Sequence, residues 1–348
     1  MKKQGRKKVS VVNIVGIGAF ALILAAFAVT NFVYYKVKAD IAGDGDMQAY
    51  KGYIRHYVFI ADDIERSFWQ EVYEGAKGRG EETGVYLEAF GIGTAVEYTK
   101  EERMQMAIAA QADGIVLEAD ESQEMQQLID EAVENDIPVV TVMTDSYGSK
   151  RQSFIGFGNY NLGREYGRQI VKFAAEGDRK VLVIMDGNMD SNTQNMISTG
   201  IREAISNEGN HLKLEVETIT DRDMTVFGSE EIVRDIFLDV ENLPDIIVCL
   251  NEQDTVSACQ AAVDYNVVGE VNIIGYYITD TLANALERKI LTSTIVTDAG
   301  QMGINSVDAL NEYIETGHVN DFIVMEVQAI TANHMGEYTE DVEKESMP

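Results

Sequence analysis

The stretch "ADDIERSFWQ", residues 61–70, combines side chains that could bind a ring-shaped molecule. Asp62 and Arg66 can hydrogen-bond to hydroxyl groups, and Phe68 and Trp69 follow them closely. Aromatic faces stack on the apolar C–H faces of sugars and similar rings. Adjacent residues of a helix point about 100° apart, so both rings do not pack easily on one sheet. We therefore predict that at least one of Phe68 and Trp69 faces a binding cleft.

Motifs for other kinds of chemistry are absent from the sequence. The chain has no phosphate-binding glycine loop, no nucleophile elbow and no zinc-ligand spacing. Alternating Asp and Asn residues from Asp186 to Asn192 are similar to the start of a calcium loop. However, Ser191 occupies the position of its glycine and Ile197 that of its bidentate glutamate. The sequence therefore predicts no catalytic residue, no metal site and no cofactor.

The elements that must position the "ADDIERSFWQ" side chains alternate along the chain. Short apolar runs without polar alternation indicate strands buried on both faces, and helical stretches separate these runs. The alternation begins at Tyr57, restarts at Phe154 and ends with a strand at Phe322–Val327. This pattern predicts an α/β fold of two blocks, each with a parallel sheet. Ligands of such sheets lie at the carboxyl ends of the strands, so polar loops should line the cleft between the blocks.

The two cysteines, Cys249 and Cys259, fall in a predicted strand and in the helix that follows it. We expect two buried free thiols, while a disulfide stays possible outside the cell.

The first forty residues form a separate region. Five basic residues precede Val11, and a mainly apolar run then extends to Tyr35. At about 1.5 Å per residue this run is long enough to cross a bilayer as a helix. Residues 1–38 are therefore predicted to be a cytoplasmic basic start and a single transmembrane anchor, with residues 39–52 as a tether and the body outside. A signal peptide cleaved near Ala26–Ala28 is the alternative.

Beyond these patterns, the chain resembles a known family. The stretch "YVFIADDIERSFWQEVYEGAK" is similar to the opening of the ribose-binding-protein type of bacterial solute receptor, in which a strand and turn precede an aromatic pair and a helix with "GA". The same fold forms the ligand-binding part of lac-repressor-like regulators. Colinear stretches extend the resemblance over about residues 55 to 330: "ADGIVLEADES", "ENDIPVVTVMTD", "FIGFGNYNLGREYG", "PDIIVCLNEQDTVSACQAA" and "VNIIGYYITDTLANALERKILTSTIVTDAGQMG".

The resemblance implies two Rossmann-like lobes joined by three hinge crossings, near Gly158, Thr297 and Phe322. Such lobes close about the hinge and trap a ligand between them. The N-terminal lobe would then comprise residues 53–157 and 298–321, and the C-terminal lobe residues 158–297 and 322–337, followed by a polar tail at 338–348.

The resemblance also implies a set of ligand-binding residues at matching positions: Asp62, Arg66, Phe68, Trp69, Met143, Thr144, Asn195, Asn251, Tyr277 and Thr297. Asp145 lies beside Thr144, and Asp221 and Arg222 are expected close to a further contact. The chain departs from the family at several of these positions. Met143 and Thr144 replace the usual Asp-Arg pair, an arginine is expected near Asn195, and Tyr277 replaces an aspartate. The groups that hold pentose hydroxyls are thus mostly replaced. A sugar or cyclic polyol stays the expected ligand class, but a pentose is not implied.

The predicted function is a non-enzymatic, membrane-anchored solute receptor outside the cytoplasm. Its closed form would be presented either to the permease of an ABC transporter or to a membrane histidine kinase. Two alternatives stay open: a cytoplasmic regulator without a DNA-binding headpiece, and a receptor for a nucleoside, an autoinducer or an anionic polyol. The chain carries 58 acidic and 28 basic residues, for a net charge of −30. A surface this acidic repels phosphate backbones, so no nucleic-acid partner is expected.

Overall fold

The structure is a computed structural model that describes residues 52–90, 98–187, 189–221 and 226–333. The described residues from Arg55 onward belong to one compact unit. The predicted anchor, residues 39–51 of the tether, the polar tail and Arg222 lie outside the described residues. Among the described helices, none is both long enough and apolar enough to cross a membrane.

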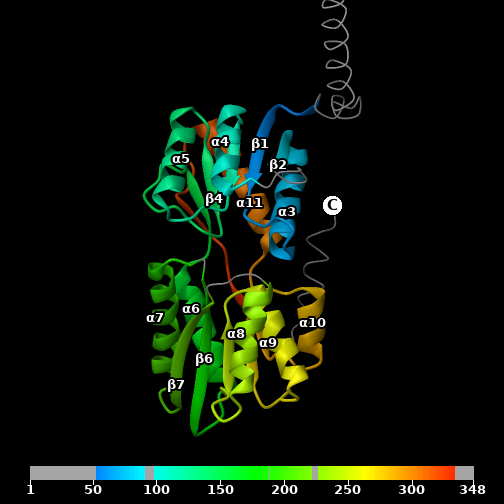
Figure 1. Cartoon of the computed structure of the whole chain (residues 1–348). Helices are drawn as coiled ribbons and strands as arrows, with labels where there is room; N and C mark the ends of the chain where they lie inside the picture. The colour runs from blue at the N-terminus through cyan, green and yellow to red at the C-terminus, as the bar shows by residue number, and fades with distance from the viewer. Residues whose placement is uncertain (1–51, 91–97, 188, 222–225, 334–348) are drawn as a thin grey trace, which may run out of the picture. The chain divides into compact units, whose positions relative to one another are not determined.

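The first lobe contains one six-stranded sheet with the strand order β11-β5-β4-β3-β1-β2, and every pairing in it is parallel. Figure 1 labels its strands β1, β2 and β4. In chain order its elements are β1 (Arg55–Ile60), α3 (Ser67–Thr83), β2 (Val85–Ala89), α4 (Lys100–Ala109), β3 (Gly114–Leu117), α5 (Gln123–Glu134), β4 (Val139–Val142), β5 (Ser153–Gly156), α11 (Ala299–Thr316) and β11 (Phe322–Val324).

The second lobe contains a sheet with the matching order β12-β10-β9-β8-β6-β7, parallel except for the antiparallel pair β10–β12. Its elements are α6 (Asn159–Phe173), β6 (Asp178–Asp186), α7 (Ser191–Glu208), β7 (Lys213–Asp221), α8 (Val226–Leu238), β8 (Ile246–Cys249), α9 (Glu252–Asp264), β9 (Asn272–Tyr276), α10 (Asp280–Glu287), β10 (Ser293–Val296) and β12 (Gln328–Ile330). The two-block α/β architecture predicted from the alternation is confirmed.

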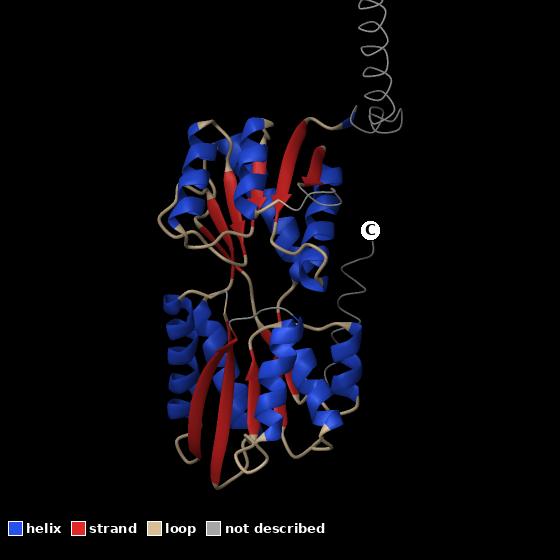
Figure 2. Cartoon of the chain, viewed as in Figure 1, coloured by secondary structure: helices blue, strands red, loops and turns tan. Residues whose placement is uncertain are grey.

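Helices cover both faces of each sheet (Figure 2). Along β1, Tyr57 and Phe59 point toward α3 and α11, whereas Val58 and Ile60 point toward α4 and α5. This alternation follows from the two-residue period of a strand. Burial on both faces explains why the strands appear in the sequence as uninterrupted apolar runs.

The chain passes between the lobes at three places, after β5, after β10 and after β11. The third passage differs from the expected one near Phe322. Residues Phe322–Val324 still pair with β5 in the first sheet, and only Gln328–Ile330 pair with β10 in the second. The single strand expected at Phe322–Val327 is therefore wrong. The segment that begins with this apolar run pairs first with a strand of the first sheet and then, a few residues later, with a strand of the second. A local sequence pattern does not specify which strand a residue pairs with.

Helices α3 and α11 approach each other closely because glycines lie at their contact. A Cβ atom on Gly303 would collide with the backbone of Val72 and Ala76, and one on Gly75 would collide with the backbone of Gly300. Contact at this distance fixes α3 against the first lobe. The helix that begins with Ser67, Phe68 and Trp69 is therefore held rigidly at its position.

Candidate functional site

An aromatic contact joins the two lobes at the carboxyl ends of their sheets. Phe68, in the first turn of α3, meets Tyr277, which follows β9, edge to face with 5.3 Å between the ring centres. The Tyr277 hydroxyl also donates a hydrogen bond to the carboxylate of Glu71, one turn further along α3. The structure thus brings together two of the predicted site residues from opposite lobes.

Trp69 points elsewhere. Its ring packs at 6.2 Å from the ring of Phe59 on β1, so it lies in the core of the first lobe. Phe68 and Trp69 are 7% and 6% exposed, and their rings meet nearly at right angles. The two rings therefore point in different directions, Phe68 toward Tyr277 of the other lobe and Trp69 toward the sheet. That one of them binds a ligand stays a prediction.

Two residues with a left-handed backbone stand at equivalent positions of the lobes. Met143 follows β4 with φ 67°, and Tyr277 follows β9 with φ 65°. Each donates its N–H to the next strand of its sheet, Met143 to Ile155 O at 2.9 Å and Tyr277 to Ile295 O at 2.8 Å. Non-glycine residues in this region are strained, and such strain is concentrated at functional sites.

Tyr276 adds a second contact between the lobes. Its hydroxyl lies 3.8 Å from the sulfur of Met143. Burial raises the pKa of the Tyr276 phenol, and the negative charge of Asp186 raises it further. The hydroxyl is therefore neutral at physiological pH and can donate a hydrogen bond.

A charged cluster lies where β1 and β3 end. The Lys100 ammonium group, 7% exposed as a residue, donates to the Asp62 carboxylate at 2.8 Å, and Glu118 accepts the Asp62 backbone N–H at 2.7 Å. Burial alone would lower the pKa of Lys100, but the charges of Glu118 and Asp62 together raise it. Asp62, a predicted ligand residue, is thus already paired within its own lobe.

Burial raises the pKa of Glu118 to about 7, more than the positive charge of Lys100 lowers it. Glu118 therefore holds its proton more tightly in the folded chain than in the unfolded one. The stabilisation that this proton gives is complete below pH 4.5 and is lost as the pH rises through about 7.

Glu118→Gln should remove this pH dependence because glutamine keeps the oxygen that accepts the Asp62 N–H. We expect the unfolding free energy of the native chain, relative to the variant, to fall by about 1–2 kcal/mol between about pH 5 and pH 8. Urea unfolding of both proteins at the two pH values measures this difference. Parallel pH profiles would show that Glu118 does not titrate in this range.

Charged groups also act across the lobes. Burial raises the pKa of Glu252, at the start of α9, and the positive charge of Arg66 from the first lobe lowers it. Burial likewise raises the pKa of Glu121 in the first lobe, and the charge of Asp190, the N-cap of α7, raises it further. Arg66 itself is exposed and pairs with Asp63 at 3.0 Å.

Thr144 and Asp145 are engaged within the first lobe. Thr144 Oγ1 donates to Ala119 O at 2.5 Å. Both oxygens of Asp145 accept from Arg151, at 2.7 and 2.8 Å, and Thr141 donates to the same carboxylate. Asp145 therefore acts in the structure as the partner of a half-buried arginine.

The remaining predicted residues lie at several places in the second lobe. Asn251 caps α9, accepting the Asp254 N–H at 2.7 Å, and is 7% exposed. Asn195 is exposed on α7, and Asp221 ends β7 in register with Asp186. Thr297 Oγ1 donates to Glu326 O at 2.9 Å, which joins the second passage between the lobes to the third.

Sequence reasoning missed Glu71, Tyr276 and Glu252. Glu71 lies three residues after Phe68, a spacing that places both on one side of a helix, and this signal was available. Tyr276 and Glu252 adjoin the predicted residues Tyr277 and Asn251, but only the folded chain shows that they reach the other lobe.

Two further findings concern reactive groups. Cys249 and Cys259 are buried and unbonded, and burial raises the pKa of both thiols. Within the described residues, no cluster of three or more His, Cys, Asp or Glu side chains could hold a metal ion.

Comparisons with known proteins give one family and several similar folds. Residues 57–318 match the family model described as periplasmic binding protein domain. No curated protein matches the chain. Several solved structures are similar to this chain over most of their own length, and three of them are described here.

GanP, a glucose-galactose binding protein from Geobacillus stearothermophilus, is 23% identical with a TM-score of 0.70, covering 81% of this chain and 98% of its own. A solute binding protein of an ABC transporter from Burkholderia graminis, in complex with D-arabinose, is 19% identical with a TM-score of 0.73, covering 83% and 99%. The XylFII–LytSN complex is 24% identical with a TM-score of 0.67, covering 80% and 98%. Identities this low establish the fold alone.

Proposed function

This chain belongs to the periplasmic binding protein domain family, and we propose that it captures a sugar or sugar-like ring between its two lobes. The observation that carries the proposal is the contact of Phe68 with Tyr277 and of Tyr277 with Glu71. It joins an aromatic ring, a phenol and a carboxylate at the carboxyl ends of two parallel sheets, where such sheets bind ligands. These groups suit a molecule with apolar ring faces and a rim of hydroxyls.

In this proposal the ligand enters between Phe68 and Tyr277 and stacks on one of the rings. The Tyr277 hydroxyl and the Glu71 carboxylate, which now bond to each other, then exchange partners for ligand hydroxyls. Arg66 and Glu252, whose charges act on each other across the lobes, offer further hydrogen bonds. Asp62 and Asp145 would support the site through Lys100 and Arg151. Arg222 and Asp221 stay proposed contacts.

Closure would turn about the three passages between the lobes. The hydrogen bond from Thr297 to Glu326 joins two of these passages, so they should move together. Arg151 bonds to Asp321 just before β11 and so helps to hold, within the first lobe, the strand that leads into the third passage. A hinge of this kind needs only a few residues to absorb the change in backbone angles.

We further propose that residues 1–38 anchor the chain in the cell membrane and leave the lobes on the outer side, where they bind ligand without turnover. The basic start and the apolar run from Val11 to Tyr35 support this orientation. The closed form would then contact an ABC permease or a membrane sensor kinase. Names of similar structures support both partners, since they include an ABC transporter binding protein and the XylFII–LytSN complex.

A thermal-unfolding screen of the full-length chain tests the proposal. D-glucose, D-galactose and D-arabinose form the first group, with nucleosides and open-chain polyols as comparison. A ligand at a hundred times its dissociation constant should stabilise the fold by about 2.7 kcal/mol. If only nucleosides stabilise the chain, the proposed ligand class is wrong and a nucleoside takes the place of the sugar. If the chain converts any sugar into a product, the proposal of a non-enzymatic receptor is contradicted.

A cytoplasmic regulator is the alternative that shares this fold. Protease added to intact cells distinguishes the two, because lobes outside the membrane are cleaved and cytoplasmic lobes are protected. Because the proposed anchor leaves the lobes outside the membrane, we expect the protease to cleave them.

A further inference from the structure

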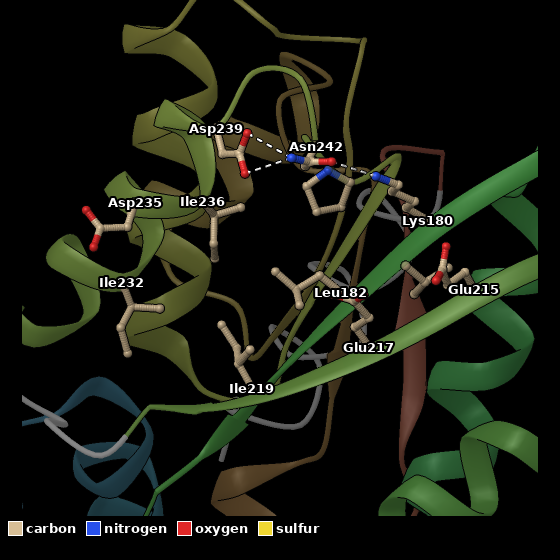
Figure 3. Close-up of a pocket in the computed structure, with 12 residues that line it drawn as sticks. Lys180, Leu182, Glu215, Glu217, Ile219, Ile232, Asp235, Ile236, Asp239 and Asn242 are labelled. Atoms are coloured by element: carbon tan, nitrogen blue, oxygen red, sulfur yellow. Dashed lines mark hydrogen bonds between the residues drawn. The ribbon is translucent and has the colours of Figure 1, made fainter.

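A hollow of about 570 Å³ lies in the second lobe, between α8 and the paired strands β6 and β7 (Figure 3). We call it the acidic groove. Leu182 and Ile219 line it from the strands, and Ile232 and Ile236 from α8. Figure 3 shows Leu182, Ile219 and Ile236 pointing into the space between these elements. None of the predicted ligand residues lines it.

Helix α8 has more apolar side chains than one buried face requires. Val233 and Phe237 are each 1% exposed and pack into the core with β8 and α9. Ile232 and Ile236 form a second pair at helical spacing that faces the groove and is only half-buried. A helix with two apolar faces is normally covered on both. Here the second face has a wall of strands on one side and an opening on the other.

The sheet ends at the groove. Among the described residues, β7 pairs only with β6 and forms the edge of its sheet. Two more apolar side chains are exposed near this end of the lobe, Leu238 at the end of α8 (58%) and Val240 just after it (72%).

The rim of the groove carries four carboxylates and one ammonium group. Glu215 and Glu217 come from β7, and Asp235 and Asp239 from α8. The ammonium of Lys180 donates to Asn242 at 3.1 Å, and the Asn242 amide donates to both oxygens of Asp239, at 3.1 and 3.0 Å (Figure 3). Asp235 has Arg234 at 3.6 Å. The excess charge on the lining is therefore negative, and a complementary surface must be basic.

We propose that the acidic groove docks a basic amphipathic helix of a partner protein. Its apolar side chains at positions i, i+3 or i+4 and i+7 enter between Leu182 and Ile236, and its lysines or arginines meet Glu215 and Glu217 on the rim. The α8 wall from Ile232 to Asp239 extends for roughly 10 Å, which matches two turns of such a helix. Docking here leaves the contact between Phe68 and Tyr277 untouched, so the proposal does not depend on the ligand.

The test uses the full-length chain in phosphatidylcholine nanodiscs and a fluorescent helical peptide of about 18 residues, with leucines on one face and lysines on the other. Anisotropy titrations, corrected with empty nanodiscs, should give micromolar binding. Glu217→Lys with Asp239→Lys should weaken it at least ten-fold. The control is Glu81→Lys with Glu131→Lys, which makes the same change of charge on exposed helix positions of the first lobe and should weaken binding less than three-fold.

A second variant, Ile232→Gln with Ile236→Gln, keeps the helix and the charge while removing the apolar wall, and should also lose at least ten-fold. It decides the outcome if the charge variant does not fold. If the groove variant and the control variant lose the same amount of peptide affinity, the peptide binds only by general electrostatic attraction to an acidic protein, and the proposal is overturned. Absence of binding at about 100 µM would do the same. Self-association of the chain that the groove variants abolish would assign the groove to a second copy instead.

Discussion

Phe68→Ala should weaken sugar binding by about ten- to a hundred-fold, a loss of about 1.4–2.8 kcal/mol. The ring faces the other lobe, and a stacked aromatic contributes both buried area and ring contact. Alanine removes both, and it also removes the contact that Phe68 makes with Tyr277 in the absence of ligand. Titration calorimetry with the sugar that stabilises the chain most measures the change.

Two further variants separate stacking from folding. Phe68→Leu keeps an apolar side chain of similar reach, so it should fold well and lose only the stacking, about three- to ten-fold in affinity. Tyr86→Leu removes an aromatic that stacks on His56 at 5.6 Å, away from the contact between the lobes, and should leave affinity unchanged. Unchanged affinity in both Phe68 variants would mean that the ligand does not stack there.

Gly303→Ala should lower the unfolding free energy by about 2–3 kcal/mol. The added Cβ would collide with the backbone of Val72 and Ala76, and neither helix backbone can rotate away as a side chain could. Because α3 carries Phe68 and Glu71, separation of the helices should also displace the site. Denaturant unfolding measures the loss of stability, and the affinity for the sugar should fall with it.

Gly78→Ala is the matched control on α3 itself. No atom lies within 4 Å of the position that an added Cβ would occupy, so alanine should stabilise the helix by about 0.5–1 kcal/mol. If both substitutions change stability equally, the close packing of α3 and α11 is not what fixes the helix.

Local patterns were sufficient to predict most of the fold. The sequence marks the strand at Gly114–Leu117 by a short apolar run, and it marks the start of the helix at Gln123–Glu134 by its N-cap residue Ser122. The passage between Val324 and Gln328 was not predictable, since pairing depends on which edge strand is free in each sheet.

The site was predictable only in part. Phe68 was recognisable as an aromatic residue at the start of a helix. Its partner Tyr277 was placed by resemblance, and the bond to Glu71 depends on how the two lobes meet. Asp62 and Asp145 were placed among the ligand groups by resemblance. Their pairing with Lys100 and Arg151 was not predictable, because a carboxylate in a loop carries no local sign of its partner.

Hydrogen–deuterium exchange of the full-length chain, with and without the best sugar, tests the central claim most directly. Capture between the lobes requires that amides in residues 62–71 and in residues 276–279 become protected together, with changes at the three passages between the lobes. Protection confined to one lobe, or to residues 215–219 along the acidic groove, would contradict it.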